Sequence, residues 1–282
     1  AAEVTPQRAC RLIRELEATY NIYVGNWASL ENNENHVPWL QERRGAIEWK
    51  FWDRYQRFLR ADEKLAPASI KSLHEVTEDV LSRLEAPDRP GEWDRRGLVA
   101  GQVQSGKTGN YTGLIAKALD SGYKLIVVLA GVHNSLRSQT QARIDKGILG
   151  FDTRNALRFD QAAQDIRIGV GRYGSFLPVN SFTSSKDNGD FSLAVARSIG
   201  VQVGGPVPTV LVVKKNARIL TTLHQWATRV GQADEDTGRV VVRNVPLLVI
   251  DDEADHASVD TNGPKRNQTD DEVDPTRING LI

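Results

Sequence analysis

A phosphate-binding pattern, G-x-x-x-x-G-K-[ST], occupies residues 101–108 of the chain. In loops of this kind, backbone N–H groups surround a phosphate, the lysine reaches the β and γ oxygens, and the Ser/Thr hydroxyl can ligate Mg²⁺. Lys107 and Thr108 hold these last two positions. The pattern therefore predicts a nucleotide site with ATP and Mg²⁺ as its ligands. The residues expected to shape the anion cradle are Gly101, Gln104, Ser105 and Gly106.

An acidic run provides a second half for this site. Residues 251–256 read Asp-Asp-Glu-Ala-Asp-His and follow the apolar run 247–250. We expect Asp252 to hold the Mg²⁺ shell and Glu253 to orient and deprotonate an attacking water. Asp251 is an extra acid, so the register stays open by one residue. Alone, such a run could be a charged turn, but behind a phosphate loop it completes one hydrolytic mechanism.

Strands and helices must bring these two halves together. Beyond residue 93, short apolar runs alternate with segments of helical apolar spacing. This alternation predicts an α/β fold in which a parallel sheet is covered by helices on both faces. A ligand would then bind at the carboxyl ends of the strands. The predicted strands are 98–100, 124–130, 209–213 and 247–250, and the predicted helices are 108–119, 133–146 and 216–230.

The first 90 residues predict an all-helical N-terminal domain, because their apolar residues recur at three- and four-residue intervals. A Pro- and Gly-containing break at 86–91 sets the boundary to an ATPase domain over 91–282. Within it, residues 150–205 lack clean periodicity and predict an insertion with at least one flexible loop, notably at 181–190. The predicted N-terminal helices are 3–20, 37–60 and 67–84; the aromatic residues of the second favour a core or docking surface over a base-stacking platform.

Composition limits the classes of partner. The 36 Lys and Arg residues balance 36 Asp and Glu residues, so contact with nucleic acid must come from local patches and not from a global positive field. Cys10 is the single cysteine, which excludes an internal disulfide and a cysteine-rich zinc site. No apolar run approaches the length of a membrane span. These features predict a cytoplasmic protein without a membrane partner.

Polar residues behind two predicted strands are candidates for contact with a nucleic-acid backbone. Such residues could equally be a polar helix start and solvated lysines, and both interpretations stay open. For Lys214 and its neighbour Lys215, the choice is between a contact with phosphate and two solvated lysines. The candidates are His133, Asn134, Arg137 and Lys214.

Four segments together resemble the Z1 domain family of bacterial proteins. They are residues 101–113, 128–141, 249–258 and 274–280, and the resemblance covers most of 37–282. It implies a RecA-like P-loop NTPase lobe of the superfamily 2 helicase type, associated with restriction-modification and phage defence. Nucleic acid, DNA more than RNA, is the implied substrate, and restriction or defence proteins are the implied partners.

The family pattern continues into a Thr-Ala-Thr-Pro-like motif and a second motor lobe with an arginine finger, and the sequence stops at Ile282 before both. On this resemblance we expect the second lobe to be absent from the sequence, and we expect this chain to bind nucleotide but to hydrolyse it very slowly. An endonuclease whose nuclease centre lies elsewhere or in a partner is one alternative, and a nucleotide-gated protein-interaction ATPase is another. Carboxylate–lysine pairs at 48–50 and 62–64 match part of a nuclease pattern, but their helical surroundings favour ordinary surface charge.

Overall fold

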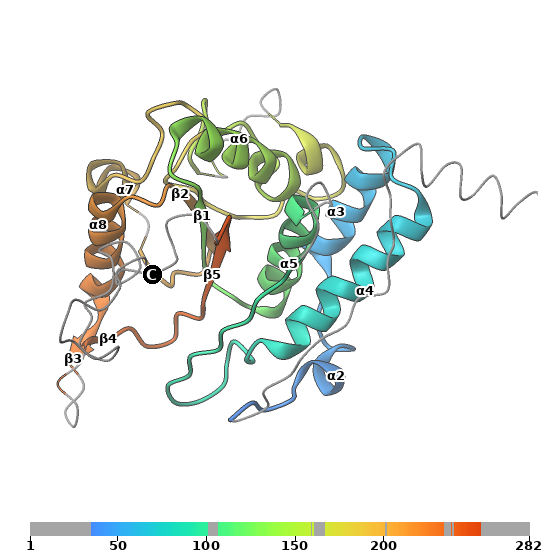
Figure 1. Cartoon of the computed structure of the whole chain (residues 1–282), viewed down its shortest axis with the longest axis horizontal. Coiled ribbons are helices and arrows are strands. Elements are labelled where there is room, and N and C mark those ends of the chain that lie inside the picture. The colour runs from blue at the N-terminus through green and yellow to red at the C-terminus, as the bar shows by residue number, and fades with distance from the viewer. Residues whose placement is uncertain are drawn as a thin grey trace, which may run out of the picture.

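A computed structural model describes residues 35–100, 107–158, 160, 167–200, 202–233, 238 and 240–254 (Figure 1). The cradle residues 101–106, the predicted helix 3–20 and the segment 255–282 therefore lie outside the described residues. For Lys107, the backbone alone is described. No helix in the described part of the chain is long and apolar enough to cross a membrane.

A parallel sheet forms the centre of the described structure. Its three strands are β1 (Leu125–Ala130), β2 (Thr209–Val213) and β5 (Leu247–Asp252), in the order β2-β1-β5. Leu125 of β1 pairs with Thr209 on one side and with Leu247 on the other. The predicted strands at 124–130, 209–213 and 247–250 are confirmed. β1 and β2 are buried along their whole length, as expected of central parallel strands, whereas Leu247 and Val249 of β5 are 43% and 45% exposed. A small antiparallel pair, β3 (Gln232–Ala233) and β4 (Val240–Val241), lies apart from this sheet.

Helices cover both faces of the sheet (Figure 1). One face is covered by α5 (Lys107–Ser121), and the other by α7 (Leu193–Ile199) and α8 (Ala217–Ala227). Because side chains alternate along a strand, Ile126 and Val128 pack on the face of α5. Val127 and Leu129 pack on the face of α7 and α8. The mixed α/β class is confirmed. The remaining helical segments after β1 are α6 (Asn134–Ile144), the π-helix η1 (Asp145–Leu149), and the 3₁₀ turns η4 (Gly169–Arg172) and η5 (Thr228–Val230).

The N-terminal helices are α2 (Leu40–Arg43), α3 (Lys50–Ala61) and α4 (Pro67–Arg83). Helices α3 and α4 pack against α5, and α2 packs against α4. Trp52, Tyr55 and Phe58 of α3 are buried in the same core as the sheet face under α5, which agrees with their interpretation as core residues. Residues on both sides of the predicted boundary at 86–91 thus share one core, and the division into two domains stays a prediction.

The predicted helix over 37–60 is interrupted between α2 and α3. The physical reason is a cap from a distant residue: the Asp120 carboxylate accepts hydrogen bonds from the backbone N–H groups of Phe51 and Trp52, each at 2.9 Å. A carboxylate in this place satisfies N–H groups that have no partner inside the helix. Sequence spacing near residue 50 could not reveal it, because Asp120 belongs to α5.

The predicted strand at 98–100 is wrong. Leu98 and Val99 are 84% and 56% exposed, and neither belongs to a strand. β1 already has a partner along both of its edges, so no position beside it remains for this segment. A run of only three apolar residues also provides few ladder hydrogen bonds.

The segment 181–184 is packed, contrary to the flexible loop expected there. Its side chains are almost fully buried, with Ser181 and Thr183 at 0% exposure. It lies along the outer edge of β2, where the N–H of Val210 donates to the Asn180 carbonyl and the N–H of Val212 donates to Thr183 Oγ1. Part of the predicted insertion therefore closes one edge of the sheet.

Candidate active site

The last two residues of the phosphate-loop pattern begin α5. The Thr108 carbonyl accepts a hydrogen bond from Thr112 Oγ1 at 2.6 Å, so the helix is formed from its first turn. The Thr108 hydroxyl accepts from Arg143 Nη1 at 3.0 Å, and Arg143 is an exposed residue of α6. Free N–H groups and the helix dipole favour an anion at such an end. Of this motif, the described structure shows that Lys107 and Thr108 lie in the first turn of a helix.

The acidic run lies at the carboxyl end of β5, next to α5. Asp252 pairs with Ala130 of β1 on the sheet face that α5 covers, and its Oδ2 accepts a hydrogen bond from the Tyr111 hydroxyl at 3.3 Å. Asp251 points to the opposite face, where its Oδ1 lies 2.6 Å from Lys215 Nζ. Side chains alternate along a strand, so the two acids cannot face α5 together. The geometry favours the register in which Asp252 is the acid of the nucleotide site.

Tyr111 connects the two halves of the site, although 141 residues separate it from Asp252. Burial, followed by the nearby Asp252 carboxylate, raises the pKa of Tyr111 to about 12, while a hydrogen bond to Thr108 acts in the opposite direction. The phenol is therefore neutral at physiological pH and can donate its proton in a hydrogen bond to Asp252. Sequence reasoning missed Tyr111, and the available signal was its spacing: residues three apart on a helix lie on one face.

Glu253 occupies a strained position directly after the strand. Its φ of 58° lies in the left-handed region, which residues with a Cβ rarely adopt. Its carbonyl accepts a hydrogen bond from Lys215 Nζ at 2.6 Å. Its Oε2 lies only 3.1 Å from the point where Gly131 would carry a Cβ, so the glycine at that point leaves room for the carboxylate. Glu253 is exposed, and water can reach the acid.

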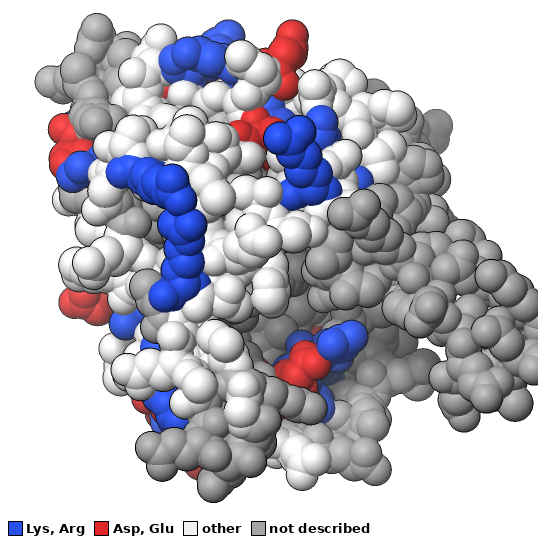
Figure 2. Space-filling view, turned by 90° about the vertical axis from the view of Figure 1, so that its left-hand side faces the viewer, with Lys and Arg blue, Asp and Glu red and all other residues white. Residues whose placement is uncertain are grey.

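Three of the four nucleic-acid candidates lie at the end of the sheet where the strands have their carboxyl ends. His133 and Asn134 follow β1 and are exposed, and Lys214 follows β2 and donates from Nζ to Asn134 Oδ1 at 2.8 Å. Figure 2 shows the side of the molecule that carries α7 and α8, where Lys and Arg side chains form separate groups and not one continuous patch. Contact with a polyanion would therefore depend on a few local residues.

Arg137 is not brought to this group. Its side chain is fully buried, and it donates to the carbonyls of Ser184 and Lys186 at 2.9 and 2.5 Å. Burial lowers the pKa of its guanidinium, and nearby carboxylates counteract that shift. In this conformation Arg137 connects α6 to the packed segment after residue 180. Lys215 is also neither a solvated lysine nor a surface phosphate contact, since its side chain is buried.

Comparisons of the chain with protein-family models, with curated proteins and with solved structures found no match. The resemblance to the Z1 family thus remains an expectation from the motifs.

The described side chains fit a magnesium ion held with a nucleotide. Thr108 offers a hydroxyl and Asp252 a carboxylate, and Mg²⁺ prefers such oxygen ligands. In phosphate sites it takes one or two protein ligands and completes its shell with phosphate oxygens and waters. Within the described residues no group of three or more His, Cys, Asp or Glu could hold a metal by itself.

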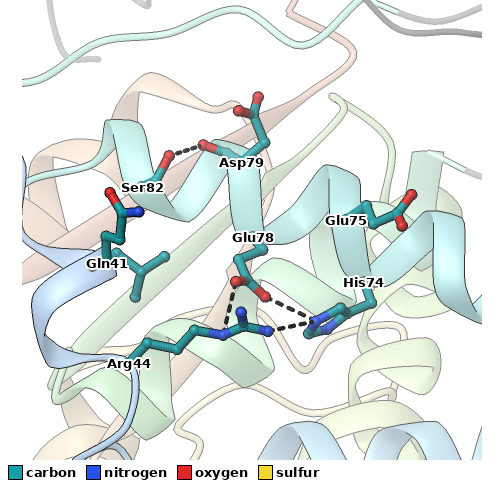
Figure 3. A pocket seen from close by; sticks show the side chains of 8 residues that line it. Gln41, Arg44, His74, Glu75, Glu78, Asp79 and Ser82 are labelled. Carbon is teal, nitrogen blue, oxygen red and sulfur yellow. Dashed lines mark hydrogen bonds and ion pairs between the residues drawn. The ribbon is translucent and has the colours of Figure 1, made fainter.

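A groove between α2 and α4, with a volume of about 540 Å³, lies away from these strand ends. Three of its polar side chains are paired with one another (Figure 3): Glu78 lies 3.0 Å from Arg44 and 2.9 Å from His74, and Arg44 lies 3.3 Å from His74. These contacts hold α2 and the loop after it against α4. The groove therefore has a structural explanation, and the polar groups at the strand ends remain the better candidate for chemistry.

Proposed function

We propose that this chain is the ATP-binding and hydrolysing RecA-like lobe of a helicase-like protein that acts on nucleic acid, DNA more than RNA. On this proposal it is a cytoplasmic protein of bacterial restriction or phage defence, with partner proteins from the same systems. The observation that carries the proposal is the hydrogen bond from Tyr111, which lies one turn after Thr108 on α5, to Asp252 at the end of β5. It supports a single site built from two motifs that are far apart in sequence.

Each residue has a distinct role in the proposed site. Gly101, Gln104, Ser105 and Gly106 surround the phosphates, and Lys107 interacts with the γ-phosphate. Thr108 and Asp252 hold Mg²⁺, whose charge offsets that of the phosphates when it is bound. Glu253 orients the attacking water and accepts its proton. The short reach from Thr108 through Tyr111 to Asp252 supports this division of work.

The group at the carboxyl ends of β1 and β2 supports nucleic acid as the polymer. The Asn134 amide, the Lys214 ammonium and the exposed His133 follow β1 and β2, at the same end of the sheet at which β5 carries Asp252. Amide and ammonium groups are the usual donors to phosphate oxygens in a nucleic-acid backbone. A polymer bound across them would lie beside the strand end that carries Glu253.

The proposal is tested by measuring ATP hydrolysis with and without DNA and RNA, in the unmodified protein and in Glu253→Gln. We expect hydrolysis to be stimulated by one polymer and to be lost in Glu253→Gln, while ATP still binds. Hydrolysis that is equally fast in Glu253→Gln would refute the assigned chemistry. Stimulation by neither polymer would instead favour the protein-interaction ATPase.

The endonuclease alternative gains no support from the described residues. Glu48 and Lys50 form an ion pair with each other at the surface, where both side chains are more than half exposed. The pairing with Lys50 lowers the pKa of the Glu48 carboxyl. An exposed pair of this kind is ordinary surface charge and offers no enclosed metal site. DNA cleavage with Mg²⁺ and without ATP would overturn this conclusion.

A further inference from the structure

Lys215 connects the carboxyl ends of all three strands of the central sheet. Its backbone N–H donates to the Gly131 carbonyl, directly after β1, at 2.8 Å. Its Nζ donates to the Glu253 carbonyl at 2.6 Å and lies 2.6 Å from Asp251 Oδ1 at the end of β5. The side chain itself is completely buried. A buried ammonium is retained only where its partners compensate for lost hydration, so its position is closely determined.

The contact with the Glu253 carbonyl is important because Glu253 has a left-handed backbone. A residue with a Cβ holds a φ of 58° only where its surroundings fix it. A charged donor on the carbonyl fixes the peptide plane that follows Glu253 and thereby opposes relaxation to an ordinary φ. The backbone conformation in turn sets the direction of the side chain, whose Oε2 lies over Gly131.

We propose that Lys215 is a positioning residue for hydrolysis: it holds the turn after β5 so that the Glu253 carboxylate faces the nucleotide site. The proposal rests on the proposed function, because it assigns Lys215 a role that acts through Glu253. Lys215 touches neither nucleotide nor water in this scheme. Loss of the ammonium releases the turn, and Glu253 moves away from the attacking water while the phosphate loop stays intact.

The consequence is a separation of nucleotide binding from hydrolysis. A base displaced by about 1 Å can lose roughly a hundredfold in rate. We therefore expect Lys215→Met to bind a fluorescent ATP analogue within about threefold of the unmodified protein, and its single-turnover hydrolysis at saturating ATP and Mg²⁺ to fall about tenfold or more. A role confined to folding would lower the fraction of protein that binds nucleotide and would leave the rate per bound nucleotide unchanged.

Lys117→Met is the matched control. Lys117 is likewise a completely buried lysine, but it lies near the far end of α5 and contacts α4. The same substitution there removes the same charge from the interior. Its hydrolysis rate per bound nucleotide should stay within about twofold of the unmodified protein, since no contact connects it to Glu253 in the described structure.

The test combines Lys215→Met with Glu253→Gln. If Lys215 acts through Glu253, the double variant hydrolyses ATP no more than about twofold slower than Glu253→Gln alone. Lys215→Met at an unchanged rate, beside a slow Glu253→Gln, overturns the positioning role and leaves the proposed function standing. An active Glu253→Gln overturns the proposed function and this inference with it.

A second variant decides the matter if Lys215→Met does not fold. Asp251→Asn keeps the ammonium but removes the negative charge that holds it in place. We expect Asp251→Asn to bind nucleotide normally and to hydrolyse it about threefold or more slower. A rate equal to that of the unmodified protein in a folded Asp251→Asn variant would overturn the positioning role.

Discussion

The two ends of α5 both carry polar groups, and their partners differ. At the carboxyl end, Lys117 is fully buried, donates to the His74 carbonyl at 2.7 Å, lies 3.6 Å from Glu78 and sits over the ring of Trp52. At the amino end, the exposed Arg143 guanidinium donates to the neutral Thr108 hydroxyl, and the Asp252 carboxylate accepts from the neutral phenol of Tyr111. Among the described residues, neither Arg143 nor Asp252 has a hydrogen bond or ion pair with a group of opposite charge.

This difference separates structural charge from charge that is available to a ligand. The interactions of Lys117 and Asp120 attach α3 and α4 to α5, and buried polar groups with such partners contribute to one fixed arrangement. The partners that the described residues provide for Arg143 and Asp252 are neutral, and a phosphate or a magnesium ion can replace such partners at little cost. Substitutions at the two ends should therefore have different effects, one on stability and the other on nucleotide chemistry.

The largest effect is expected at the amino end. Asp252→Asn removes a negative ligand of the proposed Mg²⁺ while keeping the size of the side chain, and hydrolysis should fall about a hundredfold or more. The midpoint of thermal unfolding should change little, because the described contact of Asp252 is a single long hydrogen bond from Tyr111. Both quantities can be measured on the same preparation. A large drop in the unfolding midpoint with unchanged hydrolysis would reverse the assignment of the two ends.

The next effect concerns stability at the carboxyl end. Lys117→Met should lower the free energy of unfolding by about 2 kcal/mol, because Glu78 loses one cation but keeps Arg44 and His74. Urea denaturation measures this change. Nucleotide affinity should be unaltered. A variant as stable as the unmodified protein would show that burial of the Lys117 charge offsets all that its partners contribute.

A smaller effect is expected from Arg143→Gln. If the guanidinium turns from the Thr108 hydroxyl to a phosphate oxygen, its loss should weaken ATP binding about tenfold, the size of one charge-assisted hydrogen bond. The surface position predicts no measurable change in unfolding free energy. Titration of a fluorescent ATP analogue gives the affinity. Unchanged affinity would mean that Arg143 contributes only its contact with Thr108.

The smallest effect is a pH dependence that belongs to the carboxyl end. Burial raises the pKa of Asp120 to about 7, although the N–H groups of Phe51 and Trp52 oppose the shift. An acid whose pKa is higher in the folded state binds more protons there, so its contribution to stability is full at low pH and is lost as the pH rises toward 7. The stability of the unmodified protein relative to Asp120→Asn should therefore decline between pH 5 and about pH 7. Urea denaturation at both pH values measures the difference, and a constant difference would contradict the assigned protonation.

The elements that the sequence predicts correctly are those with strong internal patterns. β1, β2 and β5 are apolar runs, and α4, α5 and α8 have regular apolar spacing, so local residues determine them. What failed depended on distant partners. The break before α3 results from the Asp120 cap, and the burial of 181–184 results from the open edge of β2.

The candidate site was predictable in its residue types but not in its connections. Thr108, Asp252 and Glu253 follow from motif spacing, and the structure brings Thr108 and Asp252 to the two sides of Tyr111. Tyr111, Arg143 and Lys215 act through contacts between separate elements, and a one-dimensional pattern carries little sign of them. The alternating faces of β5 also distinguish Asp251 from Asp252, which spacing alone left open.

The most direct test of the central claim measures how much Mg²⁺ strengthens ATP binding in four proteins: the unmodified protein, Thr108→Ala, Asp252→Asn and the double variant. One ion shared by Thr108 and Asp252 predicts that Mg²⁺ strengthens ATP binding in the unmodified protein, and that each single substitution removes most of that gain. The double variant should then lose little more than either single variant. Full Mg²⁺ enhancement in Asp252→Asn, or losses that simply add in the double variant, would contradict a shared site.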